Sequence, residues 1–94
     1  MTLEELKEHV AGCLGYEEAL VFDNPSFVDA FVGMSSDGRA VYSYDKMIEC
    51  LIAEDGMDYL EAMEFINYNT IRALPYMGEK APIVVYDDKP DMWE

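Results

Sequence analysis

The sequence predicts an α+β fold: a small, mostly antiparallel sheet of three to four strands packed with three helices, in the order α-β-β-β-α-α-β. Capping residues and helical spacing mark three segments, an Asp-Gly pair separates two strand-like runs, and a continuous apolar run covers residues 83–86. With 94 residues, of which 51% are hydrophobic, the chain can bury one modest core. We expect residues 1–86 to form one domain and residues 87–94 to form an acidic flexible tail.

The first helix is expected over residues 2–15. Thr2 and Glu5 have the spacing of a capping box, and Gly15 suits the C-terminal turn. The apolar residues of this segment fall on one helical stripe, which consists of Leu3, Leu6, Val10, Cys13 and Leu14. His9 lies beside that stripe, and we interpret it as a structural or solvated residue.

The three strands that follow are expected over residues 19–23 and within residues 27–44. The Asp-Gly pair at 37–38 is a strong hairpin signal, and as a two-residue turn it places Met34 opposite Val41. Neither face of this sheet is plainly polar. We therefore expect helices on one face, and either a partner or the first helix on the other.

The second helix is expected over residues 43–56, with Ser43 or Asp45 near its cap and Gly56 near its end. Met47, Ile48, Leu51 and Ile52 supply its apolar stripe.

The third helix is expected to start at Asp58, which forms a capping pair with Glu61, and to stop at Pro75. The apolar strand at residues 83–86 then suits the interior of the sheet.

Four polar residues stand among the apolar residues near the end of the third helix: Asn67, Asn69, Thr70 and Arg72. Asn67 and Asn69 are two positions apart, so they cannot both face the core of a continuous helix. Arg72 could anchor an acid such as Asp23 or Asp45. We interpret the four residues as a structural polar junction, with a direct functional role as the alternative.

The charge balance is the most unusual global property, because 20 acidic residues stand against six basic ones and the net charge is -14. This disfavours direct binding to nucleic acid or to an anionic membrane, and it favours a basic protein partner. Solubility alone is the simpler explanation of the acidity. On average each carboxylate has on the order of 280 Å² of surface, against roughly 110 Å² per DNA phosphate, so imitation of nucleic acid requires the acids to cluster.

The acidic residues do form local groups in the sequence. The group chosen as the partner-binding site is Glu54, Asp55, Asp58, Glu61 and Glu64. We expect it to make the main electrostatic contact with a basic partner.

No catalytic or metal-binding motif is present, and we expect no enzyme activity and no cofactor. Cys13 and Cys50 have neither CxxC nor Cys/His ligand spacing, and we interpret both as reduced core or boundary residues. No glycine-rich phosphate loop and no calcium-loop order of acids occurs. The chain also lacks a signal-peptide pattern and a membrane span, so a cytoplasmic location in a bacterial host cell is expected.

The segments DGRAVYSYDKMIE, EAMEFINYNTIRALPY and APIVVY resemble small acidic proteins of unassigned function that are carried by phages and mobile elements of Gram-positive bacteria. The resemblance covers about residues 27–86. Small acidic proteins of that kind include anti-CRISPR proteins. The resemblance therefore implies an inhibitor of a bacterial defence system, and it implies no catalytic residue.

The resulting hypothesis is an anti-CRISPR-type inhibitor that binds a basic protein, such as a CRISPR effector, and occludes its nucleic-acid groove. The first alternative is an antitoxin or regulatory partner that neutralises a basic toxin, and the second is a small-molecule-binding or enzymatic domain. The sequence leaves the target and the stoichiometry open, including whether the protein forms a homodimer.

Overall fold

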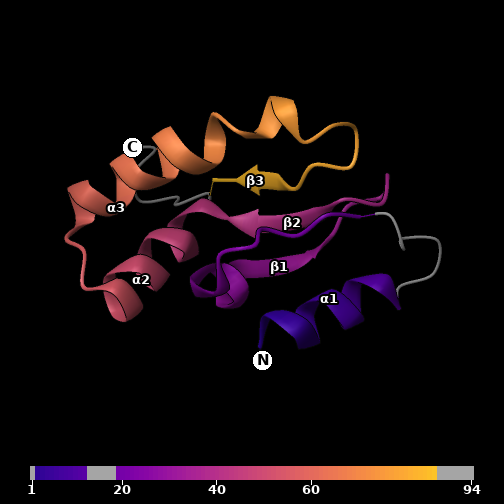
Figure 1. Cartoon of the computed structure of the whole chain (residues 1–94), viewed down its shortest axis with the longest axis horizontal. Coiled ribbons are helices and arrows are strands. Elements are labelled where there is room, and N and C mark those ends of the chain that lie inside the picture. The colour runs from indigo at the N-terminus through magenta and orange to yellow at the C-terminus, as the bar shows by residue number, and fades with distance from the viewer. Residues whose placement is uncertain (1, 13–18, 87–94) are drawn as a thin grey trace, which may run out of the picture.

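The computed structural model describes residues 2–12 and 19–86, and it confirms the α+β class (Figure 1). The elements in order are α1 (Leu3–Ala11), the 3₁₀ helix η1 (Pro25–Ala30), β1 (Phe31–Met34), β2 (Ala40–Ser43), α2 (Tyr44–Asp55), α3 (Tyr59–Phe65), the π-helix η2 (Ile66–Ile71), the 3₁₀ helix η3 (Leu74–Tyr76) and β3 (Ile83–Val85). The expected tail at residues 87–94 lies outside the described residues, as do Cys13 and the expected helix stop at Gly15.

The sheet in the described part of the chain has three strands in the order β1-β2-β3. It is mixed, because β1 and β2 are antiparallel whereas β2 and β3 are parallel, with Val41 opposite Ile83. The parallel pair requires a long crossover, which α2, α3 and the two short helices after them provide. β2 is therefore the central strand, and the expectation that residues 83–86 form an interior strand is wrong.

The hairpin between β1 and β2 has a longer loop than expected. The Ser35 N–H donates to the Arg39 carbonyl (2.7 Å), and the Gly38 N–H donates to the Ser35 carbonyl (3.1 Å). Gly38 has φ 84°, which allows it to close a three-residue loop. Met34 therefore faces Ala40 and not Val41, and the register shifts again between Phe31 and Gly33.

Residues 19–23 form no strand, and residues 27–30 belong to η1, so two parts of the strand prediction are wrong. One backbone bond, from the Leu20 N–H to the Lys80 carbonyl (3.3 Å), links residues 19–23 to the chain before β3. The Asn24 Oδ1 accepts from the Ser26 N–H (3.0 Å), and Pro25 occupies the first turn of η1. Proline has the φ that a helix start needs, so this turn competes successfully with a longer strand.

The predicted N-caps of all three α-helices are confirmed. Two predicted helix ends are wrong, because α1 ends before Gly15, and α3 ends at Phe65 and not at Pro75, which lies within η3. Thr2 and Glu5 form both bonds of a capping box at α1, which ends at Ala11 with Gly12 as its C-cap. Ser43 caps α2, and Gly56 ends it in the left-handed conformation (φ 69°). Local chemistry alone accounts for these boundaries.

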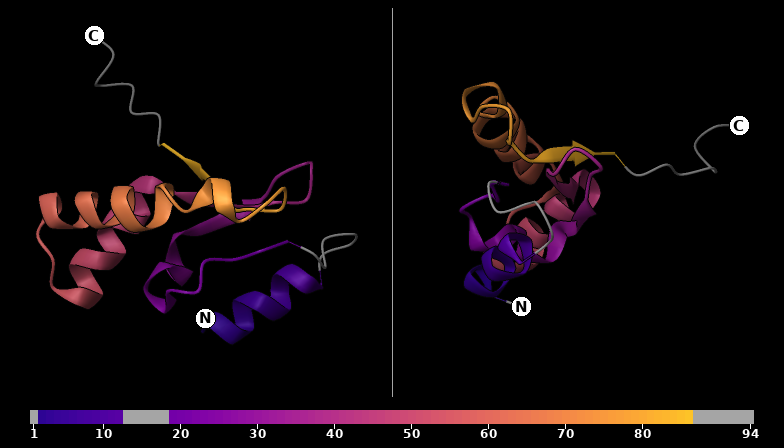
Figure 2. Two further views of the ribbon diagram at one scale, coloured as in Figure 1. Left: turned by 45° about the horizontal axis from the view of Figure 1, so that its top comes forward. Right: turned by 90° about the vertical axis from the view of Figure 1, so that its right-hand side faces the viewer.

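The helices lie on the same side of the sheet (Figure 2). On that side Tyr42 is completely buried, with its ring 4.6 Å from that of Phe22 and 5.9 Å from that of Phe31. α1 joins this core, because the His9 ring meets the edge of Phe31 at 6.0 Å. The first helix therefore does not cover the opposite face, where Val41 and its neighbour Ile83 are only half-buried.

Candidate functional site

The five acids predicted to bind a partner lie around the corner between α2 and α3, and all five are exposed. Glu54 and Asp55 end α2, Asp58 caps α3, and Glu61 and Glu64 lie within α3. We call this group, Glu54, Asp55, Asp58, Glu61 and Glu64, the acidic corner. Gly56 ends α2 two residues before α3 is capped, so the chain reverses without an intervening loop that could scatter the charges.

Three members of the acidic corner also make internal contacts. Asp58 Oδ1 accepts from the Glu61 N–H (2.8 Å), and Glu61 Oε1 accepts from the Asp58 N–H (3.1 Å). Asp55 Oδ2 accepts from the Ser26 hydroxyl (3.2 Å), which links the corner to η1. Glu54 and Glu64 make no hydrogen bond or ion pair within residues 2–12 and 19–86. These two are therefore the cleanest probes of an electrostatic role.

The structure adds two acids that the sequence argument did not connect to this surface. Asp29 of η1 and Glu49 of α2 line a shallow hollow together with Glu54 and Cys50. Asp29 is 25 positions from Glu54 in the sequence, and only the packing of η1 against α2 reveals the proximity. Helical spacing could have suggested Glu49 alone.

The thiol beside these acids is not an activated nucleophile. Burial raises the pKa of Cys50, and the negative charges of Glu54, Asp29 and Glu49 raise it further. The thiol is therefore protonated at neutral pH, which agrees with the sequence interpretation of Cys50 as a reduced core residue. Cys13 lies outside the described residues.

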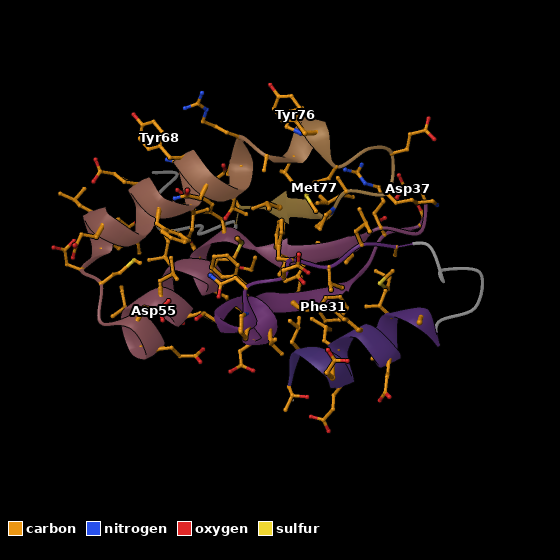
Figure 3. All side chains as sticks on the ribbon, in the orientation of Figure 1. Phe31, Asp37, Asp55, Tyr68, Tyr76 and Met77 are labelled. Carbon is orange, nitrogen blue, oxygen red and sulfur yellow. The ribbon has the colours of Figure 1, made fainter. Side chains whose placement is uncertain are left out.

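Exposed aromatic residues continue from the acidic corner along the same helical run. Tyr68 is 66% exposed and Tyr76 is 90% exposed, and both rings point away from the sheet (Figure 3). One hollow of about 430 Å³ brings Tyr68 together with Glu61 and Glu64. A second hollow, of about 580 Å³, lies between Tyr68 and Tyr76. The surface next to the acids is thus aromatic and not purely charged.

The four residues of the expected polar junction occupy the π-helix η2 and the position after it. Asn67 Oδ1 accepts from the Tyr44 hydroxyl of α2 (3.0 Å), and Asn69 Nδ2 donates to the Phe65 carbonyl (3.1 Å). Both asparagines are exposed, so neither faces the core. Thr70, in contrast, is only 8% exposed.

Arg72 does not anchor a buried acid. Its side chain is exposed, and its guanidinium carbon lies 5.8 Å from the centre of the Tyr68 ring. In the described part of the chain Arg72 forms no ion pair, so the expected pairing with Asp23 or Asp45 is wrong. The widened helix turns Arg72 outward, and that conformation cannot be read from apolar spacing.

A cavity of about 290 Å³ lies between the segment that precedes β1 and the π-helical run. Its apolar lining is Phe22, Phe27, Phe65, Ala73 and Met77, and its polar lining is Asp23, Asn24, Asn69 and Thr70. Met77 lies on the sheet side of η3, opposite to Tyr76 (Figure 3). The cavity cannot be predicted from the sequence, because it forms between segments about 45 residues apart.

The described residues lack two features, a cluster of metal-ligating side chains and a long apolar helix. They contain no group of three or more His, Cys, Asp or Glu side chains placed to hold a metal ion. They also contain no helix with the length and apolar character needed to cross a membrane.

Comparisons with protein-family models, with curated proteins and with solved structures give no match for this chain. The resemblance to mobile-element proteins therefore stays a prediction.

Proposed function

We propose that this protein binds a basic nucleic-acid-binding protein of bacterial host defence and occludes its nucleic-acid groove, as an anti-CRISPR-type inhibitor. The observation that carries the proposal is the acidic corner, where five exposed carboxylates gather within eleven residues at one tight turn. Such a group supplies the local charge density that the average surface of the protein lacks. The inhibitor acts by stoichiometric binding and not by catalysis.

The positions of the acids favour a protein partner. A groove that holds guide RNA or target DNA is lined by lysine and arginine, which an acidic surface attracts over about a Debye length of 8 Å at physiological salt. The capping bonds of Asp58 and Glu61 fix part of this charge before binding, so less side-chain entropy is lost in the complex.

The exposed tyrosines beside the acids supply the second requirement of a stable complex. Charges at an interface mainly accelerate association, whereas buried aromatic side chains commonly account for much of the affinity. Tyr68 is positioned for this role because it shares a hollow with Glu61 and Glu64. The acidic corner attracts the partner, and Tyr68 then packs against the surface of the partner.

The test compares two double charge reversals that change the net charge equally. Glu54→Lys with Glu64→Lys alters the acidic corner without removing a cap, and Glu4→Lys with Glu8→Lys alters the exposed face of α1. The measurement is DNA binding by a panel of purified CRISPR effectors loaded with guide RNA, at low and at physiological salt.

The wild-type protein should prevent DNA binding by a responsive effector. The corner reversal should slow association with that effector by about tenfold at low salt, and the α1 reversal should have a much smaller effect. The proposal fails if no effector responds to excess wild-type protein, or if both reversals weaken inhibition equally.

A further inference from the structure

The cavity between residues 22–27 and 65–77 has the character of a small-molecule site. Its volume of about 290 Å³ is near the lower end of the range for ligand pockets, roughly 300–1,000 Å³. It has apolar walls and a small number of polar groups, as such pockets usually do. At about 30 Å³ per water molecule, it has room for on the order of ten water-sized groups.

The lining of the cavity contains a polar group that the protein does not use. Thr70 is 8% exposed, and its hydroxyl makes no hydrogen bond with any residue in the ranges 2–12 and 19–86. In these ranges every side-chain oxygen that is fully enclosed has a hydrogen-bond partner, so an unbonded oxygen must be open to solvent. The Thr70 hydroxyl is therefore reached from the cavity that it lines, where a ligand can bond to it.

The π-helix places these groups. Asn69 is held by the bond from its Nδ2 to the Phe65 carbonyl, which leaves its Oδ1 as an acceptor on a residue that lines the cavity. π-helical turns are rare and frequently occur at functional sites, because the wide turn is less stable than an α-helical one. The local conformation and the unused hydroxyl therefore point to the same place.

The charge of the lining selects the kind of ligand. Asp23 is the charged residue among those that line the cavity, and it is exposed at its edge. The whole protein carries a net charge of -14, which concentrates cations near its surface and repels anions. The rings of Phe22, Phe27 and Phe65 offer an apolar interior to the rest of the molecule.

We propose that this cavity binds a small organic cation, an amine with a compact aromatic or aliphatic body. The body lies against the phenylalanines, Ala73 and Met77, and the ammonium group faces the Asp23 carboxylate. The Thr70 hydroxyl and the Asn69 carbonyl oxygen accept further hydrogen bonds from the ligand. The site goes beyond the proposed inhibitor function and does not depend on it, because Asp23 is not part of the acidic corner.

The experiment uses phenethylamine as the probe and follows backbone and methyl NMR shifts of the full chain. Three matched compounds separate charge from shape: 2-phenylethanol has the same ring without charge, 3-phenylpropanoate has the opposite charge, and ethylamine has the charge without the ring. Phenethylamine should shift signals from residues 22–27 and 65–77, and it should bind about tenfold more tightly than 2-phenylethanol. Ethylamine should leave these signals in place.

Three variants and one control variant locate the site. Asp23→Asn should weaken phenethylamine roughly five- to tenfold and leave 2-phenylethanol unchanged, whereas Asp29→Asn, an equal loss of charge beside α2, should change neither. Ala73→Leu fills the cavity from a half-buried position and should abolish binding of both compounds. Thr70→Val should weaken binding about threefold, and circular dichroism checks that each variant is folded.

Three results would overturn the proposal. Shifts centred on the acidic corner would show only general attraction of cations. Equal binding of phenethylamine and 3-phenylpropanoate would contradict a cation site. Unchanged binding by a folded Ala73→Leu variant would place the probe elsewhere. Each of these outcomes leaves the inhibitor proposal untouched, since that proposal is tested through the reversals at the acidic corner.

Discussion

The third helical run begins and ends in two different ways. At its start, the side chains of Asp58 and Glu61 each accept a bond from the other residue's backbone N–H. Just before them, Gly56 ends α2 in the left-handed conformation, and the sequence predicts both features. At its end, the run widens into the π-helix η2 without a side-chain cap. The start is determined by bonds over three residues, whereas the end depends on residues as distant as Tyr44 and Phe22. Local capping fixes the acidic corner at the start of the run. Packing between distant segments determines the irregular end of the run and the cavity beside it.

The largest expected effect comes from the core residue that begins the π-helix. Ile66 is completely buried, so Ile66→Ala should lower the free energy of unfolding by about 3 kcal/mol through lost burial and an unfilled space. The melting temperature should fall by roughly 10–20 °C. Leu60→Ala is the control, because Leu60 is 64% exposed and its truncation should change stability by no more than about 0.5 kcal/mol. Similar falls in the two variants would mean that the π-helical end does not depend on packing.

Alkaline pH should destabilise the core next to the cavity. Burial raises the pKa of Tyr42 to about 12, and its hydroxyl accepts from the Phe22 N–H (3.2 Å). The neutral phenol is favoured in the folded state, and it contributes about 2–3 kcal/mol to the free energy of unfolding. This contribution is complete below pH 10 and is lost as the pH rises from 10 to 12. Urea denaturation across this range should show the loss in the wild type and a smaller one in Tyr42→Phe. Parallel pH profiles would remove Tyr42 as the cause.

At the other end of the run, Gly56→Ala should cost about 1–2 kcal/mol, because alanine disfavours φ 69°. An added Cβ would meet nothing within 4 Å, so the expected loss is purely conformational. Gly56→Asn should cost less than Gly56→Ala, since asparagine tolerates the left-handed region. Chemical denaturation of both variants makes the comparison. If asparagine is the worse replacement, backbone conformation does not determine the corner.

Removing the cap of α3 should have a moderate effect. Asp58→Ala eliminates the bond that the Asp58 carboxylate accepts from the Glu61 N–H, and it should cost about 1 kcal/mol in urea denaturation. Glu64→Ala removes the same charge from the same helix without breaking an internal bond and serves as the matched control. Equal losses would assign the effect to charge and not to the cap.

The smallest effect is expected at Arg72. Since it is exposed and contacts the Tyr68 ring without an ionic partner in the described residues, Arg72→Ala should cost no more than about 0.5–1 kcal/mol. A buried ion pair would have made the loss several times larger. A fall of about 3 kcal/mol in thermal or urea denaturation would show that Arg72 joins the structural junction after all.

The sequence by itself determined the features that depend on neighbouring residues. The caps at Thr2, Ser43 and Asp58 follow from backbone N–H groups that a side chain three positions away can satisfy. The helix end at Gly56 follows from the ability of glycine to adopt the left-handed conformation. The exposure of the acidic corner could also be predicted, because charged side chains are rarely buried unless they are paired. The α+β class could be predicted for the same reason, from the periodicity of each segment.

The tertiary structure decided the features that depend on distant segments. The parallel pairing of Val41 with Ile83, the missing strand at residues 19–23 and the outward position of Arg72 each depend on packing between segments distant in sequence. The cavity that Thr70 lines is the clearest example, since its other wall begins at Phe22. A capping bond is fixed by a few covalent links, so sequence spacing predicts it. A cavity or a strand register is fixed by whichever long-range arrangement buries the most apolar surface, and no short stretch of the chain contains that information.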